Sequence, residues 1–223
     1  MKKLLVLLAT AVMLSTARGG EPGSFEGKVV VEWMDDPFVT AMRLVEEFRF
    51  RQAKGKVWTV PRGQVLDGKG IPPLFRDLIG QPFDGGFRKA AVIYDFAAHR
   101  MTEPWEDAMR MFYEASVAEG VPPADAKAMY LVLATQGSRW EVPGSKCFGS
   151  CHGASGTLEW RPVVDERKVG ELLAWVRAAD PELRDIDMRA QSAIRAVGPH
   201  IFTQSACQEF SGSTRIRKSC DEK

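Results

Sequence analysis

Three consecutive helix-forming runs, at residues 85–101, 102–120 and 122–137, constrain this fold more than any other feature of the chain. In the first run, apolar side chains recur at the three- and four-residue spacing of one helix face, at Phe87, Ala90, Ala91, Tyr94 and Ala98. A chain with three such runs in succession is expected to build a helical layer, against which any sheet must pack.

Residues that start and stop helices mark the ends of the second and third runs. Thr102 is the expected N-cap of the second helix, and Gly120 is expected to end it. Pro122 and Pro123 open the third helix, and Gly137 follows its last turn. These signals predict two helices joined by a short connection.

Short alternating runs precede the helices and predict strands. Residues 46–52 and 57–61 alternate apolar and polar side chains around a glycine-containing turn, which predicts a β-hairpin that Pro61 ends. Residues 28–34 are short and β-branched, and they predict a further strand. Residues 38–50 are ambiguous, because their first half is also compatible with a short helix.

Glycine and proline also divide the rest of the chain. Residues 62–73 are expected to form a loop, and residues 73–80 one or two helical turns. Residues 165–180 and 181–197 predict two further helices, separated at Asp180-Pro181, and the final segment is expected to be irregular.

The composition changes near residue 140, where cysteines first appear, and we place a domain boundary there. The predicted fold class is α+β. Residues 18–140 are expected to form a small antiparallel sheet, made of a hairpin plus an edge strand and packed by about three helices. Residues 141–223 are expected to form a helical, disulfide-bearing C-terminal extension.

Residues 1–17 have the pattern of a secretory signal peptide. Lys2 and Lys3 precede the apolar run 4–14, and small residues favour cleavage after Ala17. We therefore expect a periplasmic or secreted protein with no transmembrane segment after cleavage. The 30 Lys and Arg residues nearly balance the 29 Asp and Glu residues, so net charge gives no reason to expect nucleic acid as a partner, and the partners stay unknown.

Four cysteines lie in the last third of the chain, at Cys147, Cys151, Cys207 and Cys220. An even number of cysteines in an oxidising compartment favours disulfides, whose three possible pairings the sequence does not distinguish. Our first expectation is therefore disulfides with no cofactor.

Covalent haem c is an alternative at the same place, because Cys147 and Cys151 are followed directly by His152. The usual attachment spacing is Cys-x-x-Cys-His, whereas three residues intervene here. As a second iron ligand, Met188 is expected in a helix core, which leaves His200 as the better candidate. A zinc site built from Cys147, Cys151, His152 and a distant cysteine is a further alternative, disfavoured because exported thiols tend to oxidise.

A succession of short blocks over residues 47–140 resembles a known family. The blocks read WTVPRG, then LDGKGIPPLFRDLIG, then AAVIYDFAAHR, then WEDAMRMFYEASVAEG, then AKAMYLVL. This order is similar to the uncharacterised bacterial and phage family called domain of unknown function 1353. The family shows a Thr-Asp-Gly-Ala-Ser loop, a helix with His-Asp, and a helix with Ala-Asp-Arg.

The resemblance implies a polar site of carboxylates, a histidine and a serine, of which this chain keeps a part. Asp67 matches the loop aspartate and Asp95 the helix aspartate. Tyr94 replaces the family histidine, Gly70 the serine, and Met109 the third aspartate. Methionine does not bind hard cations, so a family metal or catalytic centre would be incomplete here.

Asp95 and His99 are four residues apart and therefore share one helix face, as in sites where aspartate orients histidine. We expect a non-catalytic or degenerate binding or structural module of the cell envelope, with Asp67 and Asp95 in structural roles. One alternative is a hydrolase using Asp67, Asp95 and His99, with or without a divalent cation. The other is a periplasmic electron-transfer protein with the haem described above.

Overall fold

The computed structural model describes most of the chain in several segments, namely residues 23–34, 41–140, 142, 159–161, 164–196, 203–204, 208–211 and 214–217. Two three-stranded antiparallel sheets form the N-terminal layer. The first has the order β1-β4-β5, with β1 at Ser24–Glu26, β4 at Phe48–Arg51 and β5 at Val57–Val60. The second has the order β2-β3-β6, with β2 at Val31–Trp33, β3 at Met42–Leu44 and β6 at Val65–Leu66.

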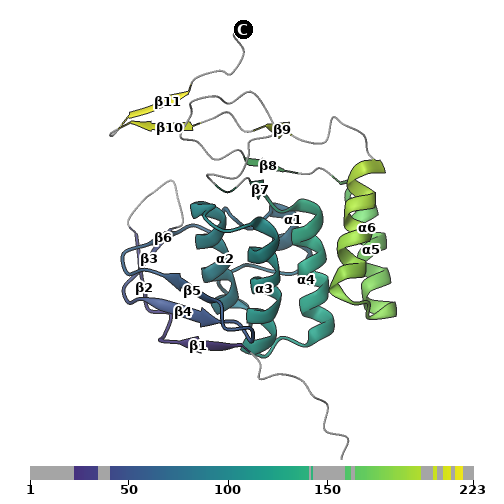
Figure 1. Cartoon of the computed structure of the whole chain (residues 1–223), viewed down its shortest axis with the longest axis horizontal. Coiled ribbons are helices and arrows are strands. Elements are labelled where there is room, and N and C mark those ends of the chain that lie inside the picture. The colour runs from purple at the N-terminus through teal and green to yellow at the C-terminus, as the bar shows by residue number, and fades with distance from the viewer. Residues whose placement is uncertain are drawn as a thin grey trace, which may run out of the picture.

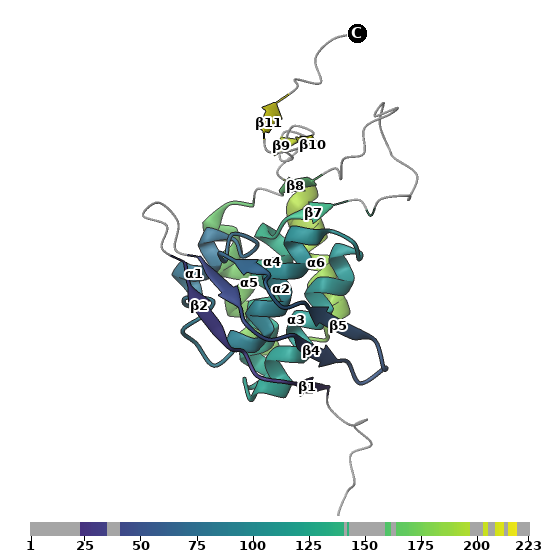
Figure 2. The ribbon, with the colours of Figure 1, turned by 90° about the vertical axis from the view of Figure 1, so that its left-hand side faces the viewer.

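Helices cover these sheets and continue away from them. They are α1 (Pro73–Leu78), α2 (Arg88–Arg100), α3 (Trp105–Glu119), α4 (Pro123–Gln136), α5 (Glu166–Ala179) and α6 (Leu183–Ala196). Strands β1 to β6 lie on one side of α2, α3 and α4, while α5 and α6 lie on the other side (Figure 1). The view turned by 90° shows the strands in front of these helices (Figure 2). This α+β arrangement confirms the predicted fold class.

The predicted β-hairpin is confirmed as β4 and β5, which pair Phe50 with Trp58 across the turn. The buried side chains of both strands alternate with exposed ones, since a strand with one buried face has a period of two. The possible short helix in the first half of residues 38–50 is wrong for Met42–Leu44, which form β3. Strand β3 lies between β2 and β6, and these two neighbours satisfy its backbone groups.

The three predicted helices are confirmed as α2, α3 and α4, but one cap differs. Thr102 is not the N-cap of α3, because the helix begins one residue after Pro104, which takes the cap position. Gly120 ends α3 with a φ of 108°, a left-handed conformation that glycine adopts without strain. Gly137 follows α4 in an extended conformation.

A continuous set of buried side chains connects the layers. Helix α4 is buried around most of its circumference because α3 packs on one side and α5 and α6 pack on the other. Val169, Val176, Ile186 and Ile194 of the last two helices belong to the same buried cluster as the strand residues. The packing of α5 and α6 therefore depends on α4. The predicted boundary at residue 140 stays a prediction.

The chain after α6 is not entirely irregular, which corrects the expectation for the final segment. It includes β9 (Thr203–Gln204), β10 (Gln208–Ser211) and β11 (Thr214–Arg217), and the last two pair with each other. Strands β7 (Arg139–Trp140) and β8 (Glu159–Arg161) form a sheet with β9 in the order β7-β8-β9.

Several predicted features fall outside the described residues, including the signal peptide, all four cysteines, His152 and His200. The disulfide, haem and zinc predictions therefore stay predictions. Met188 is not a core residue, because it is 54% exposed on α6. Within the described segments, no helix combines the length and apolar character needed to cross a membrane.

Candidate functional site

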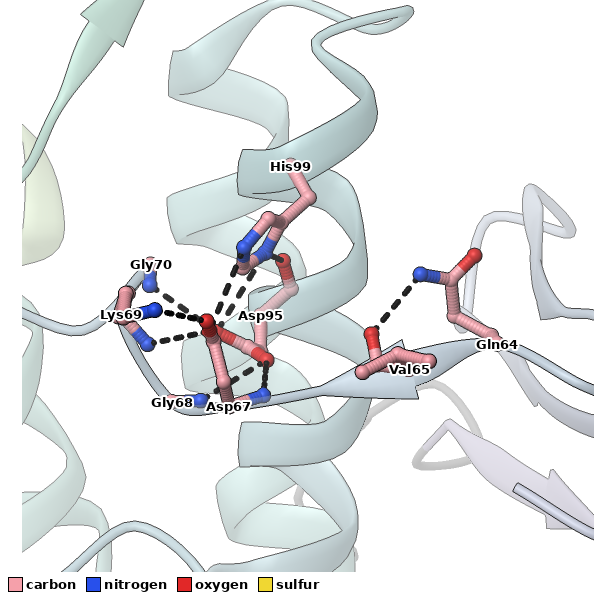
Figure 3. Close-up of polar contacts among 8 residues, drawn as sticks. All are labelled: Gln64, Val65, Asp67, Gly68, Lys69, Gly70, Asp95 and His99. Carbon is pink, nitrogen blue, oxygen red and sulfur yellow. Dashed lines mark hydrogen bonds and ion pairs between the residues drawn. The ribbon is translucent and has the colours of Figure 1, made fainter. Parts of the chain in front are cut away.

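The three candidate residues come together where the loop after β6 meets helix α2 (Figure 3). Asp67 follows β6 directly, while Asp95 and His99 lie one helical turn apart on α2. Atoms of Asp67, Asp95 and His99 that can bind a metal ion lie within 4.8 Å of one another. The structure thus brings together all three residues selected from the sequence.

The carboxylate of Asp95 accepts three hydrogen bonds from loop amides. Its Oδ2 accepts from the N–H groups of Asp67 at 3.2 Å and Gly68 at 3.1 Å. Its Oδ1 accepts from the N–H of Gly70 at 3.0 Å. These contacts tie the loop to α2 and satisfy backbone donors that would otherwise be buried without acceptors.

Asp95 is fully buried, with 0% of its surface exposed. Burial raises the pKa of its carboxyl group, whereas the His99 charge and the amide hydrogen bonds oppose that shift. A buried carboxylate with its lone pairs directed at backbone amides is a structural acceptor, because it has few free positions for a substrate proton.

Asp67 is more accessible and has different partners. Its Oδ1 accepts from the N–H of Lys69 at 3.0 Å. This contact forms a turn in which an aspartate side chain bonds to the backbone two residues later. Its Oδ2 lies 2.8 Å from Lys69 Nζ. Burial alone would raise the pKa of Asp67, but the hydrogen bonds from Lys69 and the His99 charge outweigh it and lower that pKa.

Both ring nitrogens of His99 face oxygen atoms. Nδ1 lies 2.7 Å from the backbone carbonyl oxygen of Asp95, which only accepts hydrogen bonds, so we assign the ring proton to Nδ1. Nε2 lies 3.3 Å from Oδ1 of Asp67. With Nδ1 protonated, a lone pair on Nε2 would face a carboxylate lone pair, and either a second proton or a cation between them removes that repulsion.

This arrangement differs from the one that activates a nucleophile. In a triad, aspartate holds one ring nitrogen of histidine and leaves the other directed at the reacting group. Here the Asp67 carboxylate contacts Nε2 of His99, and the peptide carbonyl of Asp95 contacts Nδ1. His99 can therefore act as a general base only after its contact with Asp67 opens.

Close packing explains one departure from the family pattern. A Cβ added at Gly70 would lie 2.9 Å from Cβ of Ala98 and 3.0 Å from Oδ1 of Asp95. The loop approaches α2 so closely that a serine at position 70 would require a shift in the loop or the helix. Tyr94, which replaces the family histidine, is fully buried and packs edge-on against Phe112.

The third family position also lies away from this cluster. Met109 is buried in the core, and Asp107 forms an ion pair with Lys56 at 2.8 Å. Lys69 is the member of the cluster that the sequence analysis missed. Its position two residues after Asp67 is the sequence signal for the hydrogen bond between its backbone N–H and the Asp67 carboxylate.

Comparisons with known proteins extend this description. Over 120 residues the chain is 36% identical to the uncharacterized protein y4jT of Sinorhizobium fredii, an alignment that covers 54% of this chain and 36% of that protein. Over 163 residues it is 28% identical to the uncharacterized protein y4iH of the same organism, covering 69% of this chain and 68% of that protein. No solved structure matches the chain.

A family model matches residues 42–133, which include every block on which the resemblance was based. The predicted resemblance over residues 47–140 is therefore confirmed, with both limits several residues earlier in the chain. The segment that contains Asp67, Asp95 and His99 lies within this match to the family described as protein of unknown function (DUF1353).

Proposed function

We propose that this protein is an exported, non-catalytic binding or structural module of the cell envelope, in which Asp95 supports the fold. The observation that carries the proposal is that the Asp95 carboxylate accepts three hydrogen bonds, from the amides of Asp67, Gly68 and Gly70. A general base needs a lone pair directed at the proton that it removes. Three of the Asp95 acceptor positions are occupied by the protein's own backbone amides.

A hydrolase screen with chromogenic carboxylate and phosphate esters tests this proposal. We expect the wild-type protein and Asp95→Asn to give the same background rate. Asp84→Asn is the matched control, since Asp84 is exposed and its side chain has no hydrogen bond or ion pair to Asp67, Asp95 or His99. Hydrolysis by the wild type that Asp95→Asn abolishes, while Asp84→Asn retains it, would overturn the proposal.

A second candidate is a hydrolase that uses Asp67, Asp95 and His99 with a divalent cation. It is supported by the convergence of their ligand atoms within 4.8 Å and by the 3.3 Å distance between Oδ1 of Asp67 and Nε2 of His99. One imidazole with carboxylate oxygens suits Zn²⁺ or Mn²⁺ better than Mg²⁺.

Titration calorimetry with ZnCl₂ and with MnCl₂ separates the two candidates. The metal hydrolase requires binding that His99→Gln weakens at least about tenfold, because the substitution removes the nitrogen ligand. Asp84→Asn should leave any such binding unchanged. Equal heats from the wild type and His99→Gln would exclude this second candidate.

Export and the state of the cysteines rest on the sequence. The basic and apolar pattern of residues 1–17 supports export, and the even cysteine number supports disulfides. Intact mass of the purified protein, with and without reductant, reports both properties together. A Soret band in its visible spectrum would replace the disulfide proposal with haem c on Cys147 and Cys151.

A further inference from the structure

A cavity of about 630 Å³ lies between helices α3, α4 and α6, on residues that the Asp67 cluster does not use. The apolar part of its lining includes Trp105, Met109 and Met188. Met188 is 54% exposed, which places apolar surface at the opening of a cavity with charged groups on its walls. A cavity of this size that combines apolar and charged lining is suited to a small organic molecule.

Arg139 is the buried charge of this cavity. The residue is only 6% exposed, and its guanidinium lies 4.5 Å from the centre of the Trp105 ring. Its Nη2 donates to the carbonyl oxygen of Ala134 at 3.1 Å, and its Nη1 donates to Oε1 of Gln191 at 3.4 Å. Both acceptors are uncharged.

No carboxylate forms an ion pair with Arg139 among the residues that the structure describes. A guanidinium has five N–H donors and stays protonated, so these two acceptors leave further donors free for a ligand. Burial lowers the pKa of Arg139, and the Glu106 charge only partly opposes this shift. Burying a cation without an anionic partner costs desolvation free energy, and binding an anionic ligand would offset that cost.

The other charged groups on the cavity wall already have partners or lie at its edge. Asp187 accepts from Arg110 at 2.5 Å and from the hydroxyl of Tyr130 at 2.6 Å. Glu106 is exposed. These two acidic side chains would repel a doubly charged phosphate, whereas a single negative charge needs only the one unpaired guanidinium.

We propose that this cavity binds a small organic carboxylate, whose charged group contacts Arg139 and whose apolar part packs against Trp105, Met109 and Met188. The planar guanidinium matches the two oxygens of a carboxylate. This site is independent of the function proposed for the Asp67 cluster.

Benzoate is a suitable probe because it joins an aromatic ring to one carboxylate, and benzamide is its uncharged counterpart. We titrate each into the full-length ¹⁵N-labelled protein and follow the indole N–H signal of Trp105 and the amide signals of Arg139 and Gln191. We expect saturable shifts of these signals with benzoate and at least about tenfold weaker binding of benzamide, because charge-assisted hydrogen bonds are the stronger ones. Equal binding of both compounds, or no shift of these signals with benzoate, would overturn the proposal.

Two pairs of variants assign the effect to this cavity. Arg139→Gln should weaken benzoate binding at least about tenfold. Its control is Arg189→Gln, because Arg189 also lies over a tryptophan ring, that of Trp175 at 4.0 Å, but is not part of the cavity lining. Unchanged affinity in a folded Arg139→Gln protein, or equal losses in both variants, would contradict the assignment.

Should Arg139→Gln not fold, the exposed Met188 provides the second pair. Met188→Glu places a negative charge at the cavity opening and should weaken benzoate binding severalfold, whereas the uncharged Met188→Gln should weaken it less. Equal affinities of these two variants would show that negative charge is not what the cavity recognises, and would overturn the proposal.

Discussion

Asp95 shows how one buried side chain determines the shape of a loop that lies far from it in sequence. Its two oxygens bind the amides of Asp67, Gly68 and Gly70 and thereby place Asp67 beside His99. The exposure of the three candidate residues increases in order, with side-chain values of 0% for Asp95, 15% for Asp67 and 38% for His99. Asp95 therefore supports the loop, whereas His99 is the residue of the three that is most accessible to solvent.

The first prediction concerns Asp95→Asn. The amide group of asparagine has one acceptor and one donor end, so either orientation directs an N–H at a backbone donor. We expect a loss of about 3 kcal/mol in the free energy of unfolding, because buried amides lose their acceptor. Urea denaturation measures this change, and Asp84→Asn should leave the midpoint in place.

The second prediction concerns acid stability and Asp67. The folded-state pKa of Asp67 lies below its ordinary value of 3.8, so its stabilising contribution is present above pH 3.8 and is lost as the pH falls through the lower value. The difference in unfolding free energy between wild type and Asp67→Asn should be constant near neutral pH and should shrink below 3.8. A difference that grows on acidification would contradict this assignment.

The third prediction concerns the close approach at Gly70. Gly70→Ala places a methyl group against Ala98 and Asp95, and we expect it to cost about 1–3 kcal/mol of unfolding free energy. In the double variant Gly70→Ala/Ala98→Gly, the total loss should be smaller than the sum of the single losses, because the two side chains share one space. Gly86→Ala is the control, since nothing lies within 4 Å of its added Cβ.

Among the elements, helix α2 depends on its neighbour for its N-terminal cap. Phe87 at its N-cap provides no side-chain hydrogen bond. Instead Glu119, in the last turn of α3, accepts from the N–H of Lys89 at 2.9 Å and of Ala90 at 3.2 Å. A carboxylate at a helix N-terminus satisfies free N–H groups and interacts favourably with the helix dipole. The α2–α3 pair is thus joined by polar contacts as well as by its core.

The fourth prediction follows from this cap. Glu119→Gln keeps one acceptor but removes the charge, and we expect a loss of about 1 kcal/mol in unfolding free energy. Hydrogen exchange should rise first at the amides of Lys89 and Ala90. The control is Glu171→Gln on α5, where the carboxylate is exposed and pairs with Lys168. Equal losses in both variants would mean that Glu119 acts as an ordinary surface charge.

At the scale of the whole molecule, α4 connects the sheet-bearing part of the chain with α5 and α6. Its apolar side chains have no single face, because neighbours surround them. Lys127 of α4 even reaches Asp180, the residue that ends α5, at 2.8 Å. Unfolding of the last two helices would therefore expose apolar surface on α4.

The fifth prediction tests this dependence. Ile186 of α6 is fully buried, and Ile186→Ala should cost about 2–5 kcal/mol of unfolding free energy. Because the core is continuous, hydrogen exchange should become faster in α2 as well as in α6. Faster exchange confined to α5 and α6 would show that the region after residue 140 unfolds independently.

Periodicity was sufficient to predict helix α2 and the β4–β5 hairpin, because burial of one face imposes a repeat on the local sequence. The later helices were predicted mainly from the proline and glycine residues at their ends. Periodicity was not sufficient for β3, whose pairing partners β2 and β6 lie elsewhere in the chain. The cap of α3 was also misplaced, because Thr102 and Pro104 compete for the start of the helix and local rules do not rank them.

The sequence by itself determined the residue types available for chemistry, since Asp67 and Asp95 were recognisable from their blocks and His99 from its spacing to Asp95. Only the tertiary structure decided what these groups face. The loop that donates amides to Asp95 and places the Asp67 carboxylate beside His99 lies 25 to 32 residues earlier in the chain. The Arg139 cavity is lined by helices α3, α4 and α6 together with strand β7. Such contacts depend on how distant elements pack, and local sequence patterns do not record that packing.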